Sequence, residues 1–129
     1  MLIEYPGYGV YHNHHPSEKL IFEDALIVLD FVLNDLKFNK NNIIIFGRSI
    51  GSGPATYMAS HIECHSLILM SPFISIKKIA NDKFSFLSFF VKNSFNNEKN
   101  MTKVKSPVFI IHGKRDRVIS VDHSIRLFK

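Results

Sequence analysis

The sequence predicts an α/β fold in which helices cover both faces of a central parallel sheet. Three apolar runs, at residues 43–46, 67–70 and 108–111, are continuous instead of alternating between apolar and polar residues, which is typical of strands buried on both faces. The intervening segments show no internal repeat and are expected to hold the covering helices. We therefore expect residues 1–129 to form one domain with a parallel sheet.

The first predicted helix starts after Ser17 and runs to about Phe38. Ser17 follows a proline and has the side chain of a good N-cap. Along the segment, apolar residues recur at spacings of three and four, which places them on one face of a helix. These residues are Ile21, Ala25, Val28, Leu29, Val32 and Leu36.

The apolar run at 43–46 ends in a Gly-x-Ser-x-Gly motif, Gly47-Arg48-Ser49-Ile50-Gly51. A serine on a tight turn between a strand and a helix is strained, and glycines two residues on either side let the backbones pass closely. Pro54 is compatible with a helix after this turn because proline is tolerated in the first turn. The motif predicts that Ser49 is a nucleophile.

The same glycines allow two other interpretations. Gly47, Gly51 and Gly53 also fit the loop with which some nicotinamide-dependent dehydrogenases hold a pyrophosphate. That loop needs an acidic residue at the end of the next strand, but the run at 67–70 is followed by Ser-Pro-Phe, and Glu63 precedes it. A Tyr-x-x-x-Lys pair is missing as well. An ordinary glycine-rich turn is the remaining alternative.

A second polar turn follows the run at 108–111. It places Asp116 just beyond the strand, and the chain order of serine, then aspartate, then histidine is the order used by one class of hydrolases. This order predicts that Asp116 is the acid of a catalytic triad. The alternative is that Asp116 caps the following helix, a frequent role for aspartate.

Five blocks, in order, resemble the α/β-hydrolase superfamily. More narrowly, the chain is similar to the α/β-hydrolase domain-containing protein 17 group, serine hydrolases that remove palmitoyl groups from cysteine thioesters on membrane-associated proteins. The resemblance implies a serine esterase or thioesterase whose substrate is an acylated protein or a lipid-like ester. The blocks are residues 5–9, 16–18, the motif around Ser49, residues 69–73, and residues 106–113 with Asp116, Val118 and Ile119.

The resemblance also implies roles for individual residues. Ser49 would attack the acyl carbonyl, the backbone N–H of Ile50 would help to hold the oxyanion, and Asp116 would orient a histidine. In the family that histidine lies beyond the position of Lys129, and His123 matches a family position that is not the base. We expect no metal or organic cofactor, and little turnover from these 129 residues alone.

The resemblance further implies that the chain is a partial hydrolase domain. Residues 1–5 match the fourth strand of the fold, so the first three strands and the last strand, with the catalytic histidine, are expected outside it. The family's strand order pairs the runs at 43–46, 67–70 and 108–111 in that order, and places the third strand between residues 2–5 and 43–46. We expect these two segments either to collapse together or to leave a gap of about 10 Å, and the exposed edge to promote aggregation or dimerisation. A non-catalytic hydrolase-like module that binds an acyl chain or a partner protein is the alternative.

The net charge of +5 and the isoelectric point of 9.4 come from charges that are spread along the chain. This distribution is typical of a solvated surface, and an anionic membrane face is a better functional alternative than nucleic acid. No apolar stretch approaches 18 residues, and no signal segment opens the chain. We therefore expect a cytoplasmic protein, with peripheral membrane association as an option.

Four smaller features have structural interpretations. The histidines at 12–15 are expected in a surface loop, with a transition-metal site as the alternative. The phenylalanines of segment 84–91 are expected to cover the sheet, or else to form an acyl-binding surface. Residues 93–98 are expected to form an exposed loop. Cys64, the only cysteine, is expected to pack in the core.

Overall fold

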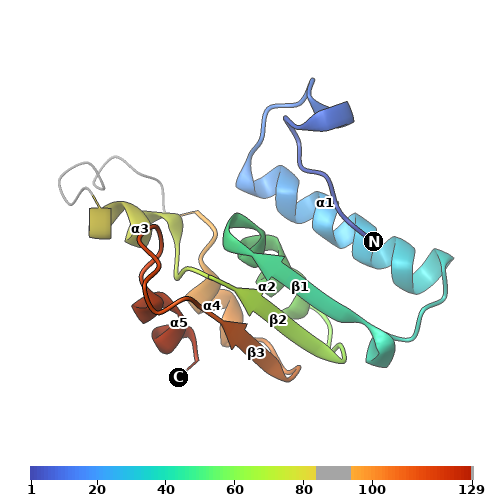
Figure 1. Ribbon diagram of the computed structural model, residues 1–129. Helices are drawn as coiled ribbons and strands as arrows, with labels where there is room; N and C mark the ends of the chain where they lie inside the picture. Colours follow the sequence, from blue (N-terminus) through green and yellow to red (C-terminus); the bar gives the residue numbers. More distant parts are fainter. Residues whose placement is uncertain (84–93, 129) are drawn as a thin grey trace.

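A computed structural model describes residues 1–83 and 94–128 of the chain (Figure 1). Its three strands form one parallel sheet in the order β1-β2-β3. The predicted strands, their parallel pairing and their order are therefore confirmed. The strands are β1 (Ile44–Arg48), β2 (Ser66–Met70) and β3 (Val108–Ile111).

Helix α2 lies on the sheet, in contact with β1 and β2. Helix α1 packs against one flank of α2 and α4 against another, and α5 contacts α4 (Figure 1). The helices are α1 (Glu18–Asp30), α2 (Ser52–Ala59), α3 (Ile76–Lys83), α4 (Asn97–Met101) and α5 (Val121–Leu127), with short turns at Gly9–Tyr11, Lys40–Asn42 and Ser49–Gly51. This arrangement confirms the predicted α/β class.

The first helix begins as predicted. The hydroxyl of Ser17 accepts a hydrogen bond from the backbone N–H of Leu20, at 3.2 Å, which satisfies one of the free donors of the first turn. After Asp30 the helix continues as a wider π-helical turn over Phe31–Asp35 and ends before Lys37, whose φ of +57° is incompatible with a helix. The buried residues of α1 are Ile21, Ala25 and Leu29.

The main core lies between the sheet and helices α1 and α2. Leu67 and Leu69, the central residues of the middle strand, are completely buried, and small alanines on α1 and α2 let the helices approach closely. Cys64 belongs to this cluster, which agrees with its predicted packing role. The buried members are Ala25, Leu29, Ile45, Ala55, Met58, Ala59, Cys64, Leu67 and Leu69.

The prediction that the strands are buried on both faces is wrong for the described part of the chain. Residues of β1 alternate strictly between exposed and buried, because α2, which contacts β1 and β2, packs against the face that carries Ile45. On the opposite face the pairing register places Phe46, Ile68 and Phe109 in one row. Phe46 and Phe109 are 56% and 60% exposed, so this face is apolar and accessible within the described residues.

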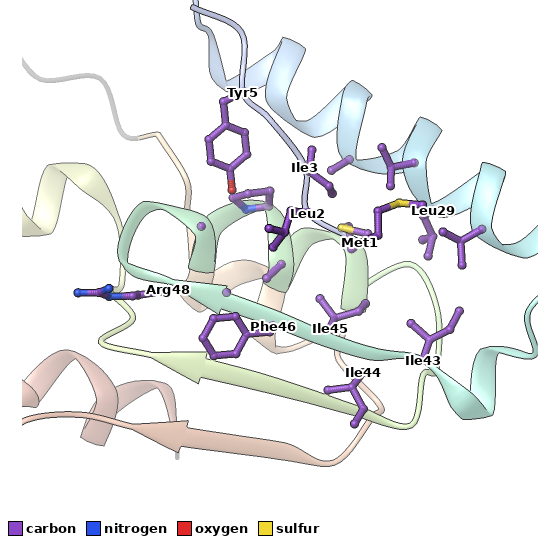
Figure 2. A pocket seen from close by; sticks show the side chains of 18 of the residues that line it. Met1, Leu2, Ile3, Tyr5, Leu29, Ile43, Ile44, Ile45, Phe46 and Arg48 are labelled. Atoms are coloured by element: carbon purple, nitrogen blue, oxygen red, sulfur yellow. The ribbon is translucent and has the colours of Figure 1, made fainter. Parts of the chain in front are cut away.

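The predicted strand at residues 2–5 is absent. This segment pairs with no strand in the described part of the chain; instead, Ile3 packs against the main core and Leu2 is fully exposed. A groove of about 480 Å³ lies between the segment, helix α1 and the outer edge of β1 (Figure 2). The groove therefore lies where the family resemblance places one further strand.

The predicted exposed loop at 93–98 is also wrong where the structure describes it. Phe95 is buried in a second cluster with Ile21, Phe73 and Ile119. Asn97, at the start of α4, is completely buried, and its side-chain amide donates to Ser52 Oγ and to the carbonyl of Phe73. The polar side chain of Asn97 is therefore buried because its amide donates to two buried oxygen atoms. Segment 84–91, predicted as sheet cover or acyl surface, lies outside the described residues.

Candidate active site

The turn that carries Ser49 has the strained geometry predicted from the motif. Strand β1 ends at Arg48, and Ser49 begins the short turn that leads into α2. Ser49 has a φ of +49°, in the left-handed region that residues other than glycine adopt rarely. The strained serine therefore lies at the carboxyl end of β1, just before the N-terminus of α2.

The two glycines of the motif are needed for close packing. A Cβ atom at Gly47 would lie 2.5 Å from Ala55 Cβ and 2.5 Å from the carbonyl oxygen of Gly51, so any side chain would separate β1 from α2. A Cβ atom added at Gly51 would lie 3.2 Å from the hydroxyl oxygen of Tyr5. Gly53 faces the ring of Phe95 and is therefore not open to a phosphate, which argues against the dinucleotide-loop interpretation.

We expect Gly47→Ala to lower the free energy of unfolding by about 1–3 kcal/mol, because the added methyl overlaps backbone and Cβ atoms that cannot move independently. Chemical denaturation of the purified chain measures this change. Gly113→Ala is the matched control, since no atom lies within 4 Å of its added Cβ. Equal stabilities of the two variants would contradict the packing role of Gly47.

Ser71 directly follows the neighbouring strand β2. The register pairs Arg48 with Met70, so Ser49 and Ser71 follow the ends of adjacent strands. Ser71 also has a positive φ, +47°, and its N–H donates to the carbonyl of Ile111 on β3, at 2.8 Å. A serine before Pro72 at the end of a predicted strand was the only sequence signal for Ser71.

Asp116 lies in the loop after β3 and is held by the backbone of its own turn. Its Oδ1 accepts from the N–H groups of Val118 and Ile119, at 2.8 and 3.0 Å. These two backbone bonds are the main cause that lowers the pKa of Asp116 below its usual value; the nearby His112 and the Ser71 hydroxyl lower it further, against the raising effect of burial. Asp116 does not cap the following helix, because Ser120 does so. It caps a tight turn that orients its carboxylate.

Ser71 links the two predicted site residues. It follows β2, the strand between those that carry Ser49 and Asp116, and its hydroxyl contributes to the lowered pKa of Asp116. The carboxyl ends of parallel strands meet at one edge of a sheet, so the three residues gather there. In the described part of the chain the Ser49 hydroxyl makes no hydrogen bond.

The two buried histidines near this edge are both engaged elsewhere. His123 Nδ1 accepts from the N–H of Ile74 at 3.0 Å, and its Nε2 donates to Asp82 at 3.0 Å. His112 Nδ1 lies 2.6 Å from Ser124 Oγ, and its Nε2 lies 2.9 Å from the carbonyl of Ile119. With both ring nitrogens occupied, neither histidine is available to Ser49 in this structure.

The pKa of His123 is lowered from its ordinary 6.5 by burial, against the opposing effect of Asp82. The unfolded chain therefore binds a proton more readily than the folded one, and we expect the free energy of unfolding to fall as the pH drops below about 6.5. Denaturation between about pH 7 and pH 5 tests this. His123→Gln should flatten the dependence in this window, and an unchanged pH profile in that variant would contradict it.

Ile50 and Tyr5 border the site on the side of the groove. Ile50 directly follows Ser49, and its side chain lines the groove together with Pro54 and Tyr5; Figure 2 shows the ring of Tyr5 at the groove. Burial raises the pKa of Tyr5, so its hydroxyl stays protonated at neutral pH. Tyr5 lies in the family block at residues 5–9, and its approach to the turn of Ser49 was not predicted.

The described residues contain no group of three or more histidine, cysteine, aspartate or glutamate side chains that could hold a metal ion. In the histidine tract, His12, His14 and His15 are exposed. His12 bonds to the carbonyl of Gly9, and the ring of His14 packs against Tyr11. The tract therefore lies in a surface loop, as expected.

Comparison with known proteins gives similar sequences and folds. Residues 10–96 match a family model described as accessory Sec system GspB-transporter. The chain is 34% identical over 126 residues to the alpha/beta hydrolase domain-containing protein 17C of Xenopus tropicalis, and 31% identical over 128 residues to a putative alpha/beta hydrolase of Acanthamoeba polyphaga mimivirus. These matches cover 98% and 97% of the chain, but only 40% and 47% of the relatives.

Two solved structures resemble the fold. A puromycin-hydrolyzing peptidase of Mycobacterium tuberculosis superimposes over 96% of this chain and 22% of its own, with a TM-score of 0.72 and 16% identity. The acylaminoacyl peptidase of Pyrococcus horikoshii gives a TM-score of 0.66 over 86% of this chain and 21% of its own, also at 16% identity. At this identity the likeness concerns the fold. Separately, no helix in the described residues has the length and apolar character needed to span a bilayer.

Proposed function

We propose that this chain, a member of the α/β-hydrolase superfamily, belongs to a serine hydrolase that cleaves acyl esters or thioesters. Over residues 10–96 the chain also belongs to the family described as accessory Sec system GspB-transporter. The observation that carries the proposal is the strained turn at Ser49, with a φ of +49° at the carboxyl end of β1. Strain of this kind persists where the surrounding structure enforces it and concentrates at functional sites.

In the proposed mechanism, Ser49 Oγ attacks the acyl carbonyl and forms an acyl-enzyme. A histidine takes the proton of the hydroxyl and later delivers it to the leaving group, and Asp116 orients that histidine. The N–H of Ile50, next to the nucleophile at the start of α2, donates to the oxyanion. Water then hydrolyses the acyl-enzyme. The low pKa of Asp116 supports this role because an ionised acid stabilises an imidazolium.

We place the catalytic histidine outside these 129 residues. His112 and His123 use both ring nitrogens in other hydrogen bonds, and the chain spans about 40% of the length of the alpha/beta hydrolase relative from Xenopus tropicalis. The complete protein is therefore the active form, and this chain alone should hydrolyse substrates slowly because the general base is missing.

The substrate class rests on the relatives. The protein 17 group, which the chain resembles, acts on palmitoyl thioesters of proteins, so we propose an acylated protein as the substrate and a lipid-like ester as the next choice. Such substrates are presented at membranes, and the net charge of +5 favours association with an anionic bilayer surface from the cytoplasmic side.

A non-catalytic binding module is the second candidate. The match of residues 10–96 to a family described by its part in an accessory Sec system favours this alternative, because that description names transport and no hydrolysis. In that case the strained turn would be retained as packing, since Gly47 and Gly51 also hold β1 against α2 and Tyr5.

A substrate panel on the complete protein separates these candidates. We expect hydrolysis of a palmitoyl thioester reporter and of a short-chain p-nitrophenyl ester, and slower cleavage of an aminoacyl p-nitroanilide, since amides are poorer acyl donors than esters. A folded complete protein that turns over none of the three would contradict the proposed function and favour the binding module.

A further inference from the structure

A chain of hydrogen bonds leads from helix α5 to the carboxylate of Asp116. Ser124 Oγ lies 2.6 Å from His112 Nδ1, and His112 Nε2 lies 2.9 Å from the carbonyl oxygen of Ile119. The N–H of Ile119 donates to Asp116 Oδ1 at 3.0 Å. Thus a residue of α5, the first residue after β3 and the turn of Asp116 form one connected network.

The direction of each bond follows from its acceptor. A carbonyl oxygen only accepts, so His112 Nε2 carries the ring proton and donates it to Ile119. Nδ1 is then the acceptor, and the hydroxyl of Ser124 donates to it. The carbonyl and the N–H of Ile119 lie in the two peptide units that flank its Cα. Fixing the carbonyl therefore restricts the direction in which the N–H points toward Asp116.

Burial makes this network difficult to replace by water. The side chain of His112 is 3% exposed, and Ser124 is buried on α5. The Asp116 side chain is 22% exposed, so its carboxylate is open on one side while its turn is held from the other. His112 Nε2 lies 3.7 Å from Asp116 Oδ2, so its N–H dipole attracts the carboxylate without forming a full hydrogen bond.

We propose that His112 and Ser124 are positioning residues for Asp116: they hold Ile119 so that its N–H fixes the carboxylate in one orientation. Both act through Ile119, the residue that His112 holds. The inference rests on the proposed function only for its effect on catalysis, because the orientation of Asp116 can be measured in the chain itself.

The first test uses nuclear magnetic resonance on the 129-residue chain. In Ser124→Ala and His112→Leu we expect the pKa of Asp116 to rise toward its ordinary 3.8, and the amide of Ile119 to exchange at least about tenfold faster. His112→Gln should retain most of the wild-type behaviour, because its amide reaches the Nε2 position and can donate to Ile119. Ser124→Ala keeps the test available if His112→Leu fails to fold.

The matched control is Ser106→Ala. It removes another buried serine hydroxyl, which accepts from the N–H of Cys64 at 2.8 Å, at the opposite end of the sheet. It should lower stability without changing the titration of Asp116. An unchanged Asp116 pKa and Ile119 exchange rate in Ser124→Ala and His112→Leu would overturn the proposal, as would an equal effect in Ser106→Ala.

The second test uses the complete protein. Ser124→Ala should lower kcat by about tenfold or more with little change in KM, and should shift the acidic limb of the pH profile, since a misplaced acid orients the base less well. If Ser49→Ala leaves hydrolysis intact, the proposed function is wrong. The resonance test of the Asp116 pKa and of Ile119 exchange would still decide whether His112 and Ser124 position Asp116. If Ser49→Ala abolishes hydrolysis but kcat and the pH profile are unchanged in Ser124→Ala and His112→Leu, the positioning role fails alone.

Discussion

Replacing Ser49 by alanine should reduce ester and thioester hydrolysis by the complete protein by about 10⁶-fold, because the loss of a serine nucleophile removes the covalent route. The substitution removes one oxygen from a partly exposed residue whose hydroxyl makes no hydrogen bond among the described residues, so the fold should be retained. Rates with a palmitoyl thioester reporter, measured beside the circular dichroism spectrum, give the result.

Ser60→Ala provides the control for this experiment. Ser60 ends α2, and its hydroxyl donates to the carbonyl of Tyr57 at 2.7 Å, away from the strand ends. Its hydrolysis rate should equal that of the wild type. If Ser49→Ala hydrolysed the reporter as quickly as Ser60→Ala, another residue would be the nucleophile.

Asp116→Asn should lower kcat by about 10³- to 10⁴-fold, the effect expected when the acid of a triad loses its charge and no longer selects the correct tautomer of the base. The fold should survive, because the asparagine oxygen can still accept from the N–H groups of Val118 and Ile119, as Oδ1 does now. Steady-state kinetics of the complete protein measure the change.

A nearby carboxylate serves as the comparison. Asp122 lies in the first turn of α5 and bonds to Ser120, so Asp122→Asn removes the same charge from the same region without touching the turn of Asp116. We expect it to leave kcat unchanged. A loss of equal size in both variants would assign the effect to net charge instead of orientation.

The strands were predictable from sequence because their signal is local, whereas the order β1-β2-β3 was expected from the family resemblance and is confirmed. Each strand is a short run of apolar residues followed by a turn, and the Gly-x-Ser-x-Gly motif required a strained residue at position 49, which the φ of +49° confirms. Ser17 likewise marks its helix start through a contact only three residues away.

Features that depend on distant partners were not predictable in this way. Continuous apolar runs indicated burial on both faces, but burial needs a covering element, and in the described residues one face of β1 is left exposed. Residues 2–5 have the composition of a strand, but in the described part of the chain they pair with no other strand. Asn97 looked like a loop residue because its bonds to Ser52 and Phe73 join segments far apart in sequence.

In the candidate site, too, the residues with local sequence signals were predicted and those that depend on distant contacts were not. Ser49 and Asp116 were found from spacing to glycines and strand ends, and their catalytic roles remain predictions. Ser71 and His112 were missed because the residues that they act on, Asp116 and Ser124, lie on other segments of the chain. A serine or histidine at a strand end carries no pattern that distinguishes a positioning role from an ordinary polar turn.

Covalent labelling tests the central claim most directly. The complete protein is treated with a fluorophosphonate probe, digested, and mapped by mass spectrometry to the modified residue. We predict a single adduct on Ser49, absent in Ser49→Ala, slower to form in Asp116→Asn, and weak in the 129-residue chain alone. An adduct on a different residue, formed together with loss of hydrolysis while Ser49 stays unmodified, would contradict the assignment of Ser49 as the nucleophile.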